Sequence, residues 1–231
     1  SGGLPPHHWN GPAAMRRHGK RHGHRIAVGA LALLAAAAVA SPAPQASRRL
    51  FDGKTLKGWE GNLAVFRVEN GAITAGGPSQ PIPRNEFLCT TERFSDFILT
   101  LEFRVEGSQA NAGVQFRTER IPNHHEVSGY QADIGEGYWG SLYDESRRNR
   151  ILAQADPAVI AAVLKRDGWN MYEIHCEGPR IRLKLNGRQT VDYVETDDSI
   201  PREGVIGLQI HSGPPMQVWY RNIRIRPLRP R

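Results

Sequence analysis

The chain has 231 residues, of which 39% are hydrophobic and 23% are charged. Its formal net charge of +7 is largely contributed by the first 40 residues, which hold five basic residues and no acid, because residues 41–231 carry 25 Lys and Arg against 23 Asp and Glu, a net charge of +2. A basic nucleic-acid-binding surface is therefore not expected, and the presence of only two cysteines excludes a disulfide-rich scaffold.

Residues 1–40 are expected to comprise a short upstream stretch and a secretory signal that starts at Met15. Basic residues precede an apolar run of 15 residues, from Ile26 to Ala40, which ends in the small-residue triplet Ala38-Val39-Ala40. That run is shorter than the roughly 20 residues of a membrane-spanning helix. We therefore expect cleavage after Ala40, a periplasmic or secreted protein, and no membrane span in the mature form.

Residues 41–49 are rich in Pro, Ala and Ser and are predicted to be a tether, and residues 50–228 are predicted to form a single domain. Alternation with period two runs through this region and indicates half-buried antiparallel strands. In residues 97–105, five apolar side chains alternate with Thr100, Glu102 and Arg104. Similar strands are predicted at 171–176, 181–185, 205–211 and 218–225.

Turn and capping residues complete the fold prediction. Asn186-Gly187 joins two alternating runs and is a strong hairpin signal, because both turn positions can adopt positive φ. One helix is predicted, at 157–165, with Asp156 as N-cap, Pro157 at its first position and Gly168 beyond its end. Many short strands with one brief helix predict an all-β fold, a two-sheet antiparallel β-sandwich.

Charged and aromatic side chains crowd the segment 129–150, which lies between hydrophobic strands. The segment contains Asp133, Glu136, Asp144, Glu145, Arg147, Arg148, Tyr130, Tyr138, Trp139 and Tyr143. Carboxylates, guanidinium groups and flat rings are suited to binding polyhydroxylated ligands, so the segment predicts a sugar site. A solvated, salt-bridged loop is the alternative that composition leaves open.

Three polar residues of this segment belong to one predicted strand. Alternation puts Gln131 and Asp133 on one face, and an irregularity at Gly135 would turn Glu136 to the same side. The spacing resembles the Glu-x-Asp-x-x-Glu strand of laminarinase-type glycosidases, in which the first Glu is the nucleophile. Gln131 holds that position here, and an amide cannot form a glycosyl ester, so a retaining double displacement is not expected. Ordinary strand polarity is the alternative.

Further candidates lie on neighbouring predicted strands. Arg117 could stabilise an oxyanion or bind a sugar hydroxyl, and a structural ion pair is its alternative. Gln209 and His211 share a face opposite to three apolar residues, and His211 ends its strand, where it would line a rim. A hydrogen-bonded structural histidine is the alternative.

Aromatic residues and metal ligands give weaker signals. Tyr138, Trp139, Tyr143 and Trp169 are candidates for stacking on sugar rings, whereas Trp59 and Trp219 are assigned to the core. The sequence leaves open a divalent cation held by Asp133, Glu136, Asp144 or Glu145. A redox cofactor is not expected, because no Gly-rich nucleotide motif is present.

Cys89 and Cys176 are predicted to be small buried hydrophobes, with one disulfide as the alternative.

Several segments together resemble the 3-keto-disaccharide hydrolase family, which has a concanavalin A-like lectin/glucanase fold, a jelly roll. The matching segments, between about residues 50 and 228, are LFDGKTLKGW from Leu50, FSDFILTLEFR from Phe94, NAGVQFR from Asn111, GYQAD from Gly129, GSLYDESRRN from Gly140, GWNMYEIHCEG from Gly168, LNG from Leu185, GVIGLQIH from Gly204 and the closing YRNIRIRPL. Two positions depart from the family pattern: Ala112 replaces the usual Ser, and the 131/133 pair reads Gln/Asp where many members have Glu/Gln.

The resemblance implies cleavage of glycosides whose glucose has been oxidised at C3, so the expected substrate is an oxidised mono- or disaccharide glycoside. The ketone acidifies the C2 proton, a base removes it, the enolate expels the C1 oxygen, and water adds to the resulting glycal. A separate sugar 3-dehydrogenase would act upstream. No carboxylate nucleophile is needed, which agrees with Gln131.

Residue type and facing supply the candidates for each role. They are Asp133 or His211 as base, Glu136 or Glu145 as acid, and Arg117 or Arg147 on the enolate, with Gln131, Tyr138, Trp139, Tyr143, Asp144, Arg148, Trp169 and Gln209 contacting the sugar. A non-catalytic carbohydrate-binding module of the same fold is the main alternative, and a conventional glycosidase is a further one. Convergence of Asp133, Arg117 and His211 on one small pocket would favour catalysis, and an open groove would favour binding.

Overall fold

Strands dominate the structure, a computed structural model that describes residues 45–229. In chain order the elements are β1 (Arg48–Arg49), β2 (Trp59–Glu60), β3 (Phe66–Glu69), β4 (Ala72–Gly76), β5 (Glu86–Thr90), β6 (Phe97–Glu106), β7 (Asn111–Arg120), β8 (Val127–Gly135), β9 (Leu142–Glu145), β10 (Ile151–Ala153), α1 (Pro157–Val163), β11 (Asn170–Glu177), β12 (Arg180–Leu185), β13 (Arg188–Val194), β14 (Val205–Ile210) and β15 (Gln217–Pro227). The predicted signal peptide lies outside the described residues.

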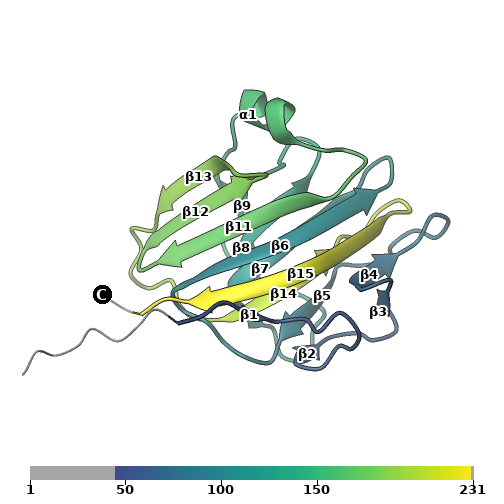
Figure 1. Ribbon diagram of the computed structural model, residues 1–231, viewed down its shortest axis with the longest axis horizontal. Helices are drawn as coiled ribbons and strands as arrows, with labels where there is room; N and C mark the ends of the chain where they lie inside the picture. The colour runs from purple at the N-terminus through teal and green to yellow at the C-terminus, as the bar shows by residue number, and fades with distance from the viewer. Residues whose placement is uncertain (1–44, 230–231) are drawn as a thin grey trace, which may run out of the picture. The chain divides into compact units, whose positions relative to one another are not determined.

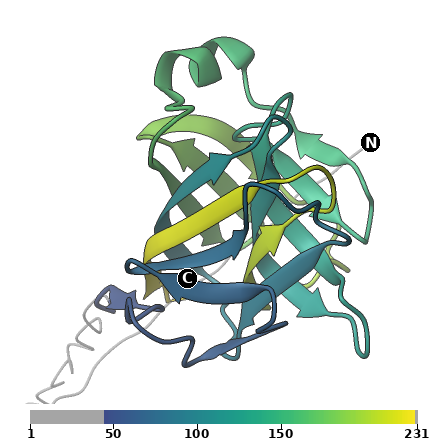
Figure 2. The same cartoon turned by 90° about the vertical axis from the view of Figure 1, so that its right-hand side faces the viewer.

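Two antiparallel sheets pack face to face (Figures 1 and 2). One has the strand order β13-β12-β11-β6-β15-β4-β3, with β1 paired to β15, and the other has the order β10-β9-β8-β7-β14-β5-β2. The predicted all-β sandwich with one short helix is therefore confirmed. No helix among residues 45–229 is long and apolar enough to cross a membrane.

Alternation along the strands directs apolar side chains into the space between the sheets. The inward-facing residues of β6 are buried, namely Phe97, Leu99, Leu101, Phe103 and Val105. On its other face Ile98, Thr100, Glu102 and Arg104 are partly exposed. Trp59 is buried as predicted. The assignment of Trp219 to the core is wrong, because Val218 and Tyr220 take the inward positions of β15 and Trp219 lies outside under Arg104.

Local signals fixed the turn and the helix start. Asn186 and Gly187 have φ values of 47° and 82° and connect β12 to β13, and the Asp156 side chain accepts from the Ala158 amide at the start of α1. The helix ends at Val163, two residues before the predicted end. The side chain of Asn170 accounts for this early end. The Lys165 N–H donates to Asn170 Oδ1 and Asn170 Nδ2 donates to the Lys165 carbonyl oxygen, both at 2.8 Å, so the backbone of Lys165 is bonded to this side chain and not to the preceding helical turn.

Both cysteines are buried and free, as small apolar residues of different sheets. Cys89 belongs to β5 and Cys176 to β11. The alternative of a disulfide between them is therefore not realised.

Candidate functional site

The outer face of the seven-stranded sheet, opposite to the sandwich core, carries a row of buried polar residues. We call this row the polar row; it consists of Gln115 on β7, Gln131 and Asp133 on β8, and Gln209 on β14. None of the four is more than 5% exposed. Polar groups buried to this degree require partners or a ligand, so this face is the first place to look for a site.

Hydrogen bonds orient the polar row toward Asp133. The Thr118 hydroxyl donates to Gln115 Oε1 at 2.8 Å, Gln115 Nε2 donates to Gln131 Oε1 at 2.6 Å, and Gln131 Nε2 donates to Asp133 Oδ1 at 2.6 Å. In these three hydrogen bonds the donor always lies on the side away from Asp133. The Gln131 amide therefore presents a fixed N–H to the Asp133 carboxyl group. The predicted common face of Gln131 and Asp133 is present in the structure.

A glycine makes room for this arrangement. Gly113 lies opposite Asp133 on β7, and a Cβ there would come within 2.6 Å of the Gln131 side chain. Gly113 has no positive φ, so its requirement is steric. The absence of a side chain at this position lets Gln131 lie across β7 and reach Gln115.

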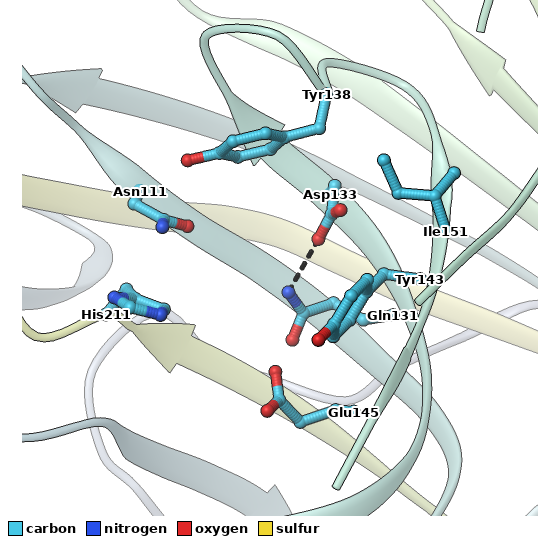
Figure 3. Close-up of a pocket in the computed structure, with 8 residues that line it drawn as sticks. All are labelled: Asn111, Gln131, Asp133, Tyr138, Tyr143, Glu145, Ile151 and His211. Atoms are coloured by element: carbon cyan, nitrogen blue, oxygen red, sulfur yellow. Dashed lines mark hydrogen bonds between the residues drawn. The ribbon is translucent and has the colours of Figure 1, made fainter. Parts of the chain in front are cut away.

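A cavity of about 240 Å³ opens beside the polar row (Figure 3). Its lining residues are Asn111, Gln131, Asp133, Tyr138, Tyr143, Glu145, Ile151 and His211. They come from β7, β8, β9 and β10, from the turn after β8 and from the end of β14. The volume lies just below the roughly 300–1,000 Å³ of typical ligand pockets, which suits a ligand about the size of one sugar ring.

Two carboxyl groups in the cavity have raised pKa values. Burial raises the pKa of Asp133 to about 7; the hydrogen bond from Gln131 opposes this shift and the charge of Glu145 adds to it. Burial, followed by the negative charges of Glu126 and Asp144, raises the pKa of Glu145 to about 7. Carboxyl groups that exchange protons near neutral pH are suited to general acid–base chemistry.

His211 adds an imidazole ring to the cavity lining, on the side away from Glu145 and Tyr143 (Figure 3). Its Nδ1 lies 2.7 Å from the Ser212 carbonyl oxygen. A carbonyl oxygen only accepts, so this contact assigns the proton of a neutral ring to Nδ1 and leaves Nε2 as an acceptor.

The turn between β8 and β9 places Tyr138 over the cavity. The Tyr138 amide donates to the Gly135 carbonyl at 3.2 Å, and the Ser141 amide donates to the Tyr138 carbonyl at 3.0 Å. Gly137 has a φ of 84°, which favours glycine. Burial, and then the charge of Asp133, raise the pKa of Tyr138, so its hydroxyl stays a donor.

Arg117 does not reach the cavity, and the expectation of a catalytic role for it is wrong. It occupies an irregularity of β7 with a φ of 46°, where the pairing with β8 shifts register. Its side chain is buried and bonds Ser95 O, Gly178 O and Asp96 Oδ1 at 2.7 to 2.9 Å. The structural ion pair that the sequence left open is what the fold forms.

Glu136 also points elsewhere. It does not follow Asp133 to the cavity, because the turn that begins at Gly135 carries it outward to an ion pair with Arg166. Both side chains are 62% exposed. Glu136 is therefore not a candidate acid.

Arg147, Asp144 and Arg148 form an ion network away from the cavity lining. Asp144 is fully buried between the two arginines, at 2.6 Å from Arg147 and 2.5 Å from Arg148, and Arg148 reaches Glu195 at 2.6 Å. Arg147 also lies over the Tyr130 ring. The expected contacts of these three residues with enolate or sugar are not supported, because the guanidinium groups are held by the carboxylates of this network.

Three other predicted sugar contacts lie outside the cavity lining. Trp139 is buried and stacks on Phe103, and Trp169 lies under Arg221. Gln209 is fully buried, and its amide makes no hydrogen bond of good geometry among the described residues, yet it lies close enough to Glu145 to oppose the rise in the pKa of that residue. Of the predicted site residues, the cavity thus gathers Asp133, Glu145, His211, Gln131, Tyr138 and Tyr143.

Two lining residues were not predicted, Asn111 and Ile151. Asn111 shares the outward face of β7 with Gly113 and Gln115, so the alternation of that strand was a signal that could have identified it. Ile151 stands on the short edge strand β10, and no sequence pattern marked it. No group of three or more His, Cys, Asp or Glu residues within 45–229 is arranged to hold a metal ion.

Comparison with known families gives a match over most of the chain. Residues 46–226 match the model of a family described as the 3-keto-alpha-glucoside-1,2-lyase-like domain. No curated protein sequence matches the chain significantly.

Solved structures share the fold at low sequence identity. A protein of Parabacteroides distasonis ATCC 8503, described as a candidate glycosyl hydrolase, is 15% identical with a TM-score of 0.61, over 79% of this chain and 94% of that one. The carbohydrate-binding module CBM66 of Bacillus subtilis is 16% identical with a TM-score of 0.56, over 73% and 95%. A Bacillus licheniformis β-glucanase is 7% identical with a TM-score of 0.51, over 82% and 100%. These likenesses establish the jelly-roll architecture.

Proposed function

Because the chain belongs to the family of 3-keto-α-glucoside-1,2-lyase-like domains, and is thus a carbohydrate-active domain, we propose that it cleaves 3-keto-glycosides by elimination and hydration. The observation that carries the proposal is the pair Asp133 and Glu145, a buried and a half-buried carboxyl group whose pKa values are both raised to about 7 in one cavity of sugar-ring size. An elimination needs a base and an acid that both exchange protons near neutral pH.

Asp133 is the better candidate for the base that removes the C2 proton. Gln131 donates to its carboxyl group, and a hydrogen bond of this kind favours the ionised form. When the C2–H bond breaks, its electron pair forms the enolate, and the proton passes to Asp133. Gln131 takes part only by holding the base, since an amide cannot attack C1.

Glu145 is the better candidate for the acid. The negative charges of Glu126 and Asp144 favour its protonated form. As the enolate re-forms the ketone, the C1–O bond breaks, and the Glu145 proton passes to the departing oxygen. Water then adds to the double bond: its oxygen bonds to C1, Asp133 returns its proton to C2, and the proton that the water loses passes by way of His211 to Glu145. Both carboxyl groups are thereby restored, and the overall reaction is a hydrolysis with no redox change.

Neutral donors take the place of the arginines on the enolate oxygen. The side-chain amide of Asn111 and the hydroxyl of Tyr138 both line the cavity. Hydrogen bonds from such groups stabilise developing negative charge in a site that excludes water. His211 Nε2 is an acceptor for the proton of the adding water.

The direct test is turnover of an oxidised substrate by the purified protein. We expect methyl 3-keto-α-glucoside and 3-keto-trehalose to be cleaved, and the unoxidised glycosides to be left intact, because only a 3-ketone acidifies C2. Released 3-keto-glucose is followed by chromatography, with and without EDTA. Loss of turnover with EDTA would assign a role to a divalent cation.

Each other result selects a different function. Saturable binding without turnover would replace the enzyme by a carbohydrate-binding module, the second candidate. Cleavage of unoxidised glycosides would favour a conventional glycosidase. If the reaction is the one proposed, a separate sugar 3-dehydrogenase must supply the ketone.

A further inference from the structure

Four basic residues gather at one edge of the sandwich, and their charged groups have no ion-pair partner within residues 45–229. They are Arg49, Lys57, Arg224 and Arg226, and we call them the basic edge. Arg49 lies on β1, which runs beside the end of β15, the strand that carries Arg224 and Arg226 (Figure 1). Lys57 belongs to the loop before β2.

An irregularity in β15 puts the two arginines of that strand on the outer face of the eight-stranded sheet. Tyr220 and Ile223 are both buried although they are three positions apart, because the pairing with β6 shifts register between them. Asn222, within the irregularity, has a φ of 52°. The strand thereby turns Arg224 and Arg226 outward, whereas uninterrupted alternation after Tyr220 would direct them into the core.

The positive charge at this edge is not compensated by its strand neighbours. Arg49 stands directly opposite Arg224 in the pairing of β1 with β15, and like charges in this position destabilise a sheet. On the other side of β15, Arg224 and Arg226 are paired with Thr100 and Ile98 of β6, which carry no charge. The basic edge therefore presents an excess of positive charge.

A cavity of about 250 Å³ adjoins β1 at the same edge. It is lined by Arg48, Arg49, Leu50, Lys57, Gly58, Thr90, Thr91 and Glu92. Glu92, the one carboxylate of this lining, is bound to Arg48 at 2.5 Å. Arg49 and Lys57 therefore leave two positive charges uncompensated beside a cavity that, like the one in the candidate site, suits one sugar ring.

A carboxylated sugar matches this cavity in charge and size. A guanidinium group binds a carboxylate with two parallel hydrogen bonds, and an ammonium group adds a compact charge. Arg224 lies opposite Arg49, and Arg226 follows roughly 7 Å further along the strand. Further carboxylates of the same polymer would therefore find partners outside the cavity, so a linear polyanion fits better than a single acidic sugar.

Two other anionic partners match this surface less well. A planar membrane would also meet the carboxylates on the rest of this face, where arginines are paired with acids: Arg104–Glu106, Arg221–Glu102 and Arg180–Asp192. Single-stranded nucleic acid binds by stacking its bases on exposed aromatic rings. The rings of Trp169 and Trp219 are instead covered by Arg221 and Arg104.

We propose that the basic edge binds an acidic polysaccharide, with one carboxylated sugar in the cavity beside β1 and neighbouring sugars along Arg224 and Arg226. The candidate site lies on the outer face of the other sheet, so a polymer bound at the basic edge leaves it open. This inference does not depend on the proposed reaction, because it holds for an enzyme and for a carbohydrate-binding module alike.

The test measures binding of polygalacturonate, in which every sugar carries a carboxylate, by calorimetry at low and at physiological ionic strength. The same polymer with methyl-esterified carboxyl groups is the control ligand. The double variant Arg49→Gln/Lys57→Gln removes the two uncompensated charges of the cavity. Its matched control, Lys165→Gln/Arg188→Gln, removes two exposed charges elsewhere that also lack an ion pair in the described part of the chain.

We expect the wild type to bind polygalacturonate and not its methyl ester. Arg49→Gln/Lys57→Gln should weaken binding about tenfold or more, the effect of losing about one charge-assisted hydrogen bond, and the control double variant should leave binding nearly unchanged. Arg224→Gln/Arg226→Gln should also weaken binding of the polymer. Thermal unfolding shows whether each variant is folded, and all four replaced residues of the basic edge lie outside the candidate site.

Equal weakening by Arg49→Gln/Lys57→Gln and by the control double variant would attribute binding to net charge and overturn the proposal. Equal binding of the methyl ester would exclude recognition of the carboxylates and overturn it as well. Tighter binding of single-stranded DNA, or of vesicles that contain phosphatidylglycerol, through the same residues would replace the polysaccharide by that partner. Undetectable binding of polygalacturonate at low ionic strength would also overturn the proposal. A lack of turnover of keto-glycosides, in contrast, contradicts only the proposed reaction.

Discussion

At the scale of single residues, the fold converts ordinary side chains into candidates for catalysis by burying them. Asp133 and Glu145 have no unusual sequence context, yet burial raises the pKa of each to about 7. Glu136, three residues from Asp133, is exposed and paired with Arg166. Alternation along the strand predicts which sheet face the Asp133 side chain is on. It does not predict that the carboxyl group is buried, because burial depends on segments distant in the sequence.

Replacing Asp133 by Asn should change how stability depends on pH. The pKa of Asp133 is raised from 3.8 to about 7 in the folded state, so the folded state binds the proton more tightly than the unfolded chain. Its contribution to stability is fully present below about pH 4 and is lost as the pH rises through about 7. Asp133→Asn should flatten this decline and, if Asp133 is the base, abolish turnover. Urea denaturation at a series of pH values measures the first effect.

Glu136→Gln is the matched control, since it removes a nearby carboxylate that is exposed. It should keep both the pH dependence of stability and the turnover of the wild type. Glu145, whose pKa is also raised to about 7, contributes a similar decline that Asp133→Asn leaves in place. A decline between pH 4 and 7 that is as steep in Asp133→Asn as in the wild type would show that Asp133 titrates normally. If Asp133→Asn retained turnover, His211 would be the remaining candidate for the base.

At the scale of elements, the site depends on irregularities within otherwise regular strands. On β7, alternation correctly places Gln115 and Asn111 on the outer face, but the register shift after Phe116 removes Arg117 from that face. On β8, the turn at Gly135 removes Glu136. Regular alternation is readable in a sequence, whereas a bulge depends on the pairing with a neighbouring strand.

Gly113→Ala tests the steric requirement of the polar row. The added Cβ would overlap the Gln131 side chain, so Gln131 must move away from Gln115 and Asp133. We expect a loss of about 1–3 kcal/mol in the free energy of unfolding and a strong decrease in turnover. Gly77→Ala is the control, because a Cβ there has no neighbour within 4 Å and the residue has no positive φ. An equal, small effect of both changes would argue against the packing role of Gly113.

At the scale of the whole molecule, the sandwich uses its two sheets differently. The inner faces bury the main core, and the outer face of the seven-stranded sheet buries a second polar layer with a small apolar cluster of Phe87, Cys89, Val127 and Val205. The cavity lies beside this buried polar layer and opens to solvent. Its lining comes from four strands and the turn after β8, which favours a small ligand that is contacted on several sides.

Export remains a prediction for the whole chain. If residues 15–40 act as a secretory signal, the protein produced in a bacterium with its natural leader should appear in the periplasm or medium with Ser41 at its N-terminus. The mass of the intact exported protein measures the cleavage point. The substitution Ala38→Arg should block cleavage after Ala40, because the cleavage site needs small residues. An unprocessed protein in the cytoplasm would contradict the prediction.

The sequence by itself determined the all-β sandwich, the family, the Asn186-Gly187 hairpin, the start of α1 and the shared face of Gln131 and Asp133. These features depend on local propensity and on the period of hydrophobic residues, which a single chain displays directly. Only the tertiary structure decided which candidates meet: Asp133, Glu145 and His211 share a cavity, whereas Arg117 and Glu136 do not. Which side chains lie in the same cavity depends on strand register, bulges and burial, which arise from contacts between segments far apart in the sequence.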